Sequence, residues 1–136
     1  MNTFQIRLSS EIIESVSTYY GIRIDEIRSR KRHAQIVRAR HVALYLIRED
    51  LRLSLHECGA LINRDHSSVL HAVNLVQQSI TPNSIGIVPD KQLTKEIADI
   101  RFLTKSTWSR SELDEIEFQI QRLIRRKEEI LKNQIQ

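Results

Sequence analysis

Five consecutive polar residues form the most chemically versatile segment of the chain, in the order Arg64, Asp65, His66, Ser67 and Ser68. A carboxylate can accept a hydrogen bond from the exocyclic amine of cytosine, and small hydroxyls can bond base edges or phosphate oxygens. If the segment begins a helix, the helix N-terminus itself favours a phosphate. This chemistry suits contact with double-stranded DNA.

The spacing around this segment predicts a helix-turn-helix. Gly59 precedes Asn63 by four residues, and Val69 follows Asn63 by six. A small residue in the first helix lets the second pack across it, and a branched apolar residue anchors the second helix. The polar residues between turn and anchor would then lie at the helix end that enters a major groove. Small helical bundles without DNA also contain capped helix pairs, so the spacing alone leaves both interpretations open.

A second signal is the distribution of charge. The chain has 21 Lys and Arg against 17 Asp and Glu, a net charge of only +4. Between Ile27 and Ile47, however, acidic residues are absent and basic ones accumulate: Arg28, Arg30, Lys31, Arg32, Arg38 and Arg40. Such a run is often a solvated face. Because acids are abundant elsewhere in the chain, the local excess favours a phosphate-binding region.

The histidines and the cysteine could instead suggest a metal or a nucleophile. The candidates are His56, Cys58, His66 and His71. Their spacings match no recognised zinc pattern, and residues five apart do not share a helix face. A single cysteine excludes an intramolecular disulfide and indicates a reducing compartment. We expect no metal, no cofactor and no catalytic cysteine. Cys58 should lie in the core, and His71 should be packed or hydrogen-bonded behind the second helix of the pair.

Helices must position these residues. With three Gly, two Pro, 40% hydrophobic and 28% charged residues, the composition is typical of a folded, helix-rich protein. Apolar spacing and capping residues predict seven helical segments: Glu11–Tyr20 with Ser10 as N-cap, Asp25–Arg28, Ile36–Leu51, a helix capped by Ser54 and ended by Asn63, His66–Ser79, Lys91–Lys105, and Ser109–Ile135. The sequence therefore predicts an all-α fold.

The prolines divide the chain. Thr81–Pro89 holds both of them and one glycine, which predicts a head at 1–80, a linker at 81–89 and a two-helix extension at 90–136. The start of the chain lacks a signal-peptide core, and no stretch is apolar enough to span a membrane. We expect a cytoplasmic protein.

From about Ile12 to Val76 the chain resembles the C-terminal, DNA-box-binding domain (domain IV) of the bacterial replication initiator DnaA. Five strings carry the resemblance, in the family's order: Tyr19-Tyr-Gly-Ile-Arg-Ile-Asp-Glu-Ile27, Ser29-Arg-Lys-Arg32, Arg38-Ala-Arg-His41, Ser54-Leu-His-Glu-Cys-Gly59 and Arg64-Asp-His-Ser-Ser-Val-Leu-His-Ala72. The resemblance implies a Trp-repressor-like helical bundle containing a helix-turn-helix, and a nucleoid location.

The resemblance also implies roles. Arg32 would enter an A·T-rich minor groove, while Arg40 and His41 would contact DNA from the start of the long helix. Major-groove readers would be Asp65, His66 and Ser67, with Ser68 on phosphate. Leu55 and His56 would touch the DNA backbone. The remaining basic residues complete the expected DNA-binding set: Arg30, Lys31, Arg38 and Arg64.

Three departures from the family pattern suggest a different or less strictly read site. The family's Arg-Pro-Arg-Gln is Arg38-Ala-Arg-His41, the turn before Arg64 is one residue shorter, and paired threonines are paired serines. In addition, glycines at 21, 59 and 86 cannot form Gly-x-x-x-x-Gly-Lys-Ser/Thr. We therefore expect a stand-alone, non-enzymatic chain that binds no nucleotide and lacks the family's ATPase domain. A small phage or mobile element is an attractive source.

The last predicted helix carries a heptad seam interrupted by one lysine: Leu113, Ile116, Ile120, Leu123, Lys127 and Ile130. It could fold back on the head or on Lys91–Lys105, or pair with another chain as a homodimer or with a protein partner. The favoured function is sequence-specific binding of double-stranded DNA at DnaA-box-like sites, regulating or assisting replication initiation. A helix-turn-helix transcriptional regulator and an interaction adaptor acting through 90–136 are the alternatives.

Overall fold

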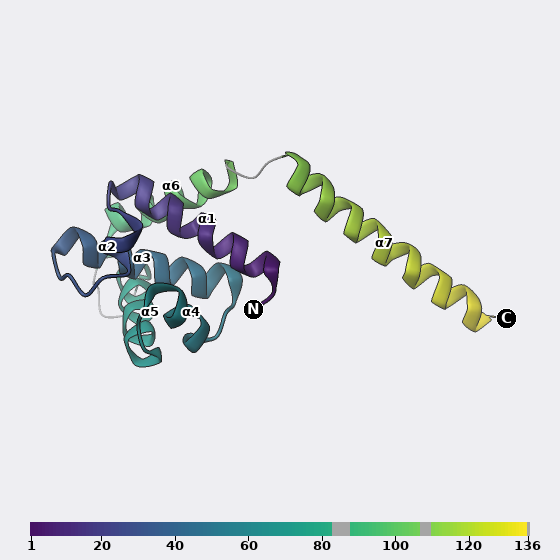
Figure 1. Ribbon diagram of the computed structural model, residues 1–136, viewed down its shortest axis with the longest axis horizontal. Helices are drawn as coiled ribbons and strands as arrows, with labels where there is room; N and C mark the ends of the chain where they lie inside the picture. Colours follow the sequence, from purple (N-terminus) through teal and green to yellow (C-terminus); the bar gives the residue numbers. More distant parts are fainter. Residues whose placement is uncertain (83–87, 107–109, 136) are drawn as a thin grey trace. The chain divides into compact units, whose positions relative to one another are not determined.

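The computed structural model describes the backbone of residues 1–82, 88–106 and 110–135, and these residues form seven helices and no strand (Figure 1). The helices are α1 (Thr3–Tyr20), α2 (Ile24–Ile27), α3 (Ala34–Leu51), α4 (Leu55–Ile62), α5 (His66–Ile80), α6 (Lys91–Ser106) and α7 (Arg110–Ile135). The expected all-α fold is confirmed. The chain divides into two compact units, Met1–Thr104 and Lys105–Gln136.

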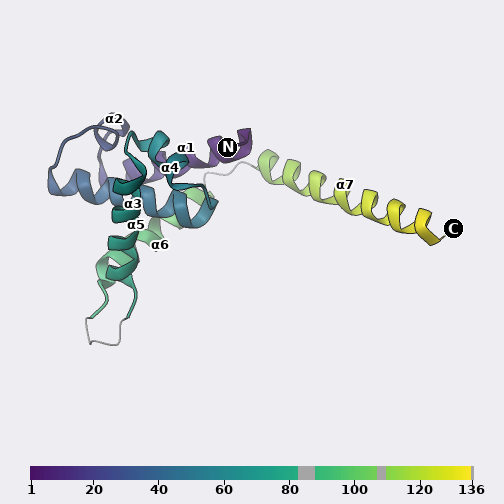
Figure 2. The same ribbon diagram turned by 90° about the horizontal axis from the view of Figure 1, so that it is seen from below.

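Helix α3 is the centre of the first unit. Every residue from Val42 to Ile47 is buried, because α1 packs on one side of the helix and α4 and α5 on another. Figure 1 shows α3 below α1, and Figure 2 shows α5 running across α3 rather than along it. A helix that is apolar all round must be enclosed by others. The short run Val42–Ile47 therefore organises the bundle.

Helix α1 begins at Thr3, so the expected start at Glu11 with Ser10 as N-cap is wrong. Asn2 and Gln5 form a capping box instead, with the Gln5 amide donating to Asn2 Oδ1 at 2.8 Å and the Asn2 amide donating to Gln5 Oε1 at 3.0 Å. The sequence gives little sign of this first stretch, because its large apolar residues Phe4 and Ile6 are exposed. The expected end is confirmed at Gly21, whose φ of 65° suits glycine.

Helix α6 belongs to the first unit, so the compact head ends at Thr104 and not at residue 80. Leu93, Ile97 and Ile100 are buried in the same apolar core as α1 and α3. The two prolines predict a linker but do not reveal that the next helix packs on the core. The second unit is correspondingly shorter than the predicted extension, and its predicted N-cap, Ser109, lies outside the described residues.

Cys58 occupies the predicted core position. Its side chain has no exposed surface, and burial raises the pKa of its thiol to about 11. The described side chains contain no group of three or more His, Cys, Asp or Glu placed to hold a metal ion. Among the described helices, none has the length and apolarity that a bilayer crossing requires.

Candidate nucleic-acid interface

The turn between α4 and α5 depends on a glycine. The Arg64 amide donates to the Gly59 carbonyl at 2.8 Å, and a Cβ on Gly59 would lie 2.1 Å from the carbonyl oxygen of Arg64. Asn63 ends α4 with a left-handed φ of 60°, and Val69 is fully buried behind the turn. Helix α4 starts at the predicted capping box, in which the Glu57 amide donates to Ser54 Oγ at 3.1 Å. The predicted helix-turn-helix geometry is confirmed.

The exposed first turn of α5 carries the polar segment. Asp65 is the N-cap, and its Oδ1 accepts from the Ser68 amide at 2.7 Å. That hydrogen bond lowers the pKa of the Asp65 carboxyl below its usual value. His66, Ser67 and Ser68 are exposed on the same turn. Asp65 therefore caps the N-terminus of α5 and also places an exposed carboxylate there.

The start of α4 lies beside the start of α5. The rings of His56 and His66 are stacked at a tilt, with centroids 4.6 Å apart. Leu55 is half-buried against the core, so its side chain packs inward and does not extend toward a ligand. The expected contact of Leu55 with DNA stays a prediction, and its side chain contributes to the core.

Arg40 holds the basic segment, defined as residues 28–33 between α2 and α3. Its guanidinium donates to the carbonyls of Ile27 at 2.8 Å, Ser29 at 2.8 Å and Lys31 at 3.0 Å. Only 5% of the residue is exposed. Burial lowers the pKa of Arg40, and the nearby charges of Arg64 and Arg32 lower it further. These contacts do not support the expected contact of Arg40 with DNA, because its Nε and Nη2 donate to the protein backbone.

Two further arginines connect the basic segment to the helix-turn-helix by hydrogen bonds. Arg64 donates to the same Ser29 carbonyl, and Arg28 Nε donates to the Leu61 carbonyl at 2.9 Å. A loop whose carbonyls are held this way keeps a defined path. The side chains of Arg30, Lys31 and Arg32 stay exposed along it.

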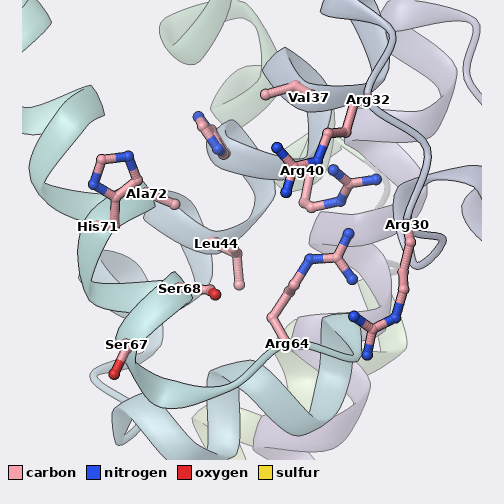
Figure 3. Close-up of a pocket in the computed structure, with 11 residues that line it drawn as sticks. Arg30, Arg32, Val37, Arg40, Leu44, Arg64, Ser67, Ser68, His71 and Ala72 are labelled. Carbon is pink, nitrogen blue, oxygen red and sulfur yellow. The ribbon is translucent and has the colours of Figure 1, made fainter.

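A groove of about 740 Å³ separates the basic segment from α5. Figure 3 shows the arginines on one side and the α5 side chains on the other; the lining residues are Arg30, Arg32, Val37, Arg40, His41, Leu44, Arg64, Ser67, Ser68, His71 and Ala72. None of these lining residues is acidic, and their only aromatic rings are the imidazoles of His41 and His71. Pockets of this volume that bind small molecules are mostly apolar. The exposed arginines of the lining, Arg30 and Arg32, favour an extended polyanion instead.

His71 lines this groove and is exposed, so the expectation that it packs behind α5 is wrong. One turn of α5 separates it from Ser67 and Ser68, which places all three side chains toward the groove. Its neighbour His41 is half-buried, and burial together with the charges of His71 and Arg40 lowers the pKa of His41. The i, i+4 spacing from Ser67 to His71 was a signal that could have found this residue.

Arg38, a further expected DNA-binding residue, is paired with a carboxylate of the protein. Its Nε and Nη2 each donate to a Glu96 carboxylate oxygen at 2.8 Å. Arg38 lines a second, smaller groove together with Arg32 and His41. The expected DNA contact of Arg38 is therefore in competition with a carboxylate from α6. Sequence reasoning missed Glu96, since no local pattern links it to residue 38.

The sequence of the first unit is similar to that of known proteins. Residues 9–76 match the family model described as bacterial DnaA protein helix-turn-helix. The chromosomal replication initiator protein DnaA of Chloroflexus aurantiacus is 37% identical over 97 residues, which are 70% of this chain and 19% of the relative. DnaA 1 of Chlamydia pneumoniae is 38% identical over 77 residues, 57% of this chain and 17% of the relative. The chain thus spans less than a fifth of the length of these relatives.

A solved structure, described as the crystal structure of a DNA replication initiation factor, is similar in fold. Its TM-score is 0.54 at 29% identity, and the match covers 75% of this chain and 28% of that chain. The family match includes the basic segment, the turn at Gly59 and the exposed first turns of α5. Because it extends over half of the 136 residues, the chain belongs to the bacterial DnaA helix-turn-helix family.

Proposed function

We propose that the first unit binds double-stranded DNA at sites similar to the DnaA box and contributes in this way to replication initiation. The observation that carries the proposal is the acid-free groove between the first turns of α5 and the basic segment. A helix N-terminus fits a major groove, and exposed arginines beside it fit a narrow minor groove. The proposed activity is binding without catalysis, and the protein would act at the bacterial nucleoid.

The exposed side chains suggest a division of roles. His66 and Ser67, at the tip of α5, are the proposed readers of base edges, with Asp65 beside them. Arg64, Ser68 and the helix end favour phosphate. On the other side of the groove, Arg32 is the proposed minor-groove residue, and Arg30 and Lys31 are proposed phosphate contacts. His41 and His71 line the groove, and His56 stacks on His66 beside the start of α5; these three residues complete the proposed surface.

Arg40 and Arg38 have a different proposed role, because Arg40 is buried and Arg38 is paired with Glu96 through two hydrogen bonds. Arg40 fixes the basic segment through three carbonyls, and Arg38 joins α3 to α6. We therefore treat them as positioning residues. This assignment separates the charges that contact a duplex from those that shape the surface.

The test compares a duplex containing a DnaA box with a scrambled duplex of the same length. His66→Ala should reduce the difference in binding free energy between them by roughly 1–3 kcal/mol, because a base contact discriminates while a phosphate contact does not. Equal loss of affinity for both duplexes would contradict a reader role. Selection of bound duplexes from a random pool would then define the site.

Asp65 needs a matched pair of variants, because it caps α5 as well as facing the proposed major groove. Asp65→Ser keeps a hydroxyl that can accept from the Ser68 amide, whereas Asp65→Ala removes the cap. If the carboxylate reads a base, both variants lose discrimination. If only the cap matters, Asp65→Ser binds like the wild-type protein.

Residues 105–136 add a second element to the proposal. Most described side chains of α7 are exposed, including large apolar ones, which favours a partner for this helix. A protein that acted only through α7 would bind box and scrambled duplexes alike. The same duplex comparison therefore distinguishes a DNA-reading factor from an interaction adaptor.

A further inference from the structure

Helix α7 carries an apolar seam that no other described element of its own unit covers. Leu113, Ile120, Leu123 and Ile130 are each 47–66% exposed, and Ile116 between them is half-buried. Their spacing alternates between three and four residues, with Lys127 at the one remaining position. Most helical stability in proteins comes from packing such a face against another element. Within the unit Lys105–Gln136, the described residues provide no such element.

The spacing of the seam positions is the same when the helix is read in either direction. Reversal about the point between Gln121 and Arg122 exchanges Leu113 with Ile130, Ile116 with Lys127, and Ile120 with Leu123. A second α7 running antiparallel would therefore place an apolar residue opposite an apolar residue in the central and outer layers. Only the two layers that contain Lys127 would pair a charge with an isoleucine.

The charge of Lys127 distinguishes the two ways of pairing. In a parallel, in-register pair, Lys127 would face Lys127 of the second copy within the seam, where two like charges repel. In the antiparallel register, Lys127 faces Ile116 of the second copy, and Glu117 is the next residue along. A lysine has a long flexible stem, so its ammonium group can reach a carboxylate at the edge of the seam. The charge pattern thus favours the antiparallel pair.

We propose that two copies of this chain associate through α7 as an antiparallel coiled coil, with Leu113 of one copy beside Ile130 of the other. This names the partner left open in the proposed function and rests on that function only for its effect on DNA. Two linked heads raise the effective concentration of the second head at a neighbouring site.

The first experiment measures the mass of the full chain by sedimentation equilibrium. The wild-type protein should have twice the chain mass, and the double variant Ile120→Asn, Leu123→Asn should have the chain mass. Phe118→Asn is the matched control, because Phe118 is 64% exposed on the same helix but lies off the seam. A monomeric wild-type chain, or a dimer unaffected by the double variant, overturns the proposal.

The second experiment determines orientation by disulfide cross-linking of Leu113→Cys and Ile130→Cys, two exposed positions. An antiparallel pair cross-links a mixture of the two variants, whereas either variant alone should cross-link little. Positions 113 and 130 are 17 residues apart, about 25 Å along a helix, so identical cysteines are out of reach. Efficient cross-linking of each variant with itself would show a parallel pair and overturn the proposed register.

A charge exchange gives an independent check. Lys127→Glu should weaken association at least tenfold, because it brings a carboxylate beside Glu117 of the second copy. Adding Glu117→Lys should restore association in the antiparallel pair. In a parallel pair, the two glutamates at position 127 would still face each other, and the second change would restore nothing.

The DNA consequence is measured last, on duplexes with one and two boxes. The full chain should gain affinity on two boxes, and the Ile120→Asn, Leu123→Asn variant should lose that gain but keep single-box binding. A chain that dimerises but does not prefer a box contradicts the proposed function alone. A monomeric chain that does prefer a box contradicts the pairing alone.

Discussion

Arg38 and Glu96 are 58 residues apart in the chain and are joined by two parallel hydrogen bonds of 2.8 Å. The Tyr20 hydroxyl donates to the same carboxylate at 2.7 Å. Glu96 is buried, and its hydrogen bonds with Arg38 hold the pKa of its carboxyl at about 2, below the usual value. One carboxylate thus links α1, α3 and α6.

Glu96→Gln should lower the free energy of unfolding by about 2 kcal/mol at neutral pH, because it removes a charge-assisted bond. The depressed pKa of Glu96 contributes stability that is present above the unfolded value of 4.5 and is lost as pH falls toward 2. Urea unfolding across this range should show a shallower loss in the variant. Glu14→Gln, at an exposed position on α1, is the control and should match the wild-type profile.

Arg38→Gln should lower stability in a similar way but leave the salt dependence of DNA binding unchanged. Its guanidinium is occupied by Glu96, and a residue that contacts no phosphate does not change the number of counterions released. Binding measured over a series of salt concentrations tests this. A slope reduced by about one unit would mean that Arg38 leaves Glu96 for a phosphate in the complex.

Arg40→Lys should destabilise the head by about 2 kcal/mol and weaken binding to all duplexes, although the charge is kept. An ammonium group lacks the planar fork that reaches the Ile27, Ser29 and Lys31 carbonyls together. Thermal unfolding and binding to box and scrambled duplexes test this. Arg30→Lys, at an exposed position of the basic segment, should change neither stability nor discrimination. Unchanged stability in Arg40→Lys would refute the positioning role.

Gly59→Ala should destabilise the head by about 1–3 kcal/mol, because the added methyl would overlap a backbone carbonyl that cannot move without opening the turn. Because the turn sets the orientation of α5, the affinity of the remaining folded protein for a box duplex should also fall. Calorimetry and binding to a box duplex measure the two effects. Ala60→Ser changes the exposed neighbouring residue and should have little effect on either quantity.

Arg32→Ala should weaken binding most on sites with a narrow, A·T-rich minor groove, where negative potential is concentrated. Lys31→Ala should weaken binding about equally on all sites and reduce the salt slope by about one unit. The measurement is affinity for duplexes that differ only in their A·T-rich half. Equal effects of both variants on all duplexes would show that Arg32 is a further phosphate contact.

His41→Gln should make stability less sensitive to mild acid. Burial, with the charges of His71 and Arg40 nearby, lowers the pKa of His41, so the unfolded chain takes up a proton more readily than the folded one. The stability contributed by neutral His41 is therefore present above the unfolded value of 6.5 and is lost as pH falls below it. Unfolding followed from pH 8 to pH 5 should show this loss in the wild-type protein and less of it in the variant.

Local signals predicted the parts of the fold that depend on neighbours in sequence. The Gly59–Asn63 spacing and the Ser54 capping box link residues four and three apart, and both are confirmed. Contacts between distant residues escaped prediction. Nothing near Arg40 or Arg38 shows that one would be buried under a loop and the other bound by α6. A basic run shows where positive charge is concentrated, but burial decides which of its members remain available.

The buried thiol of Cys58 makes the rate of chemical labelling a measure of how often the first unit opens locally. It is the single cysteine of the chain, it has no exposed surface, and a pKa of about 11 leaves little thiolate at neutral pH. A thiol reagent can therefore react only after α4 separates from the core, and its labelling rate reports the frequency of that event. Bound DNA should slow the labelling in proportion to the fraction of protein that is bound. The labelling rate of Cys58 would then report both local unfolding and DNA binding.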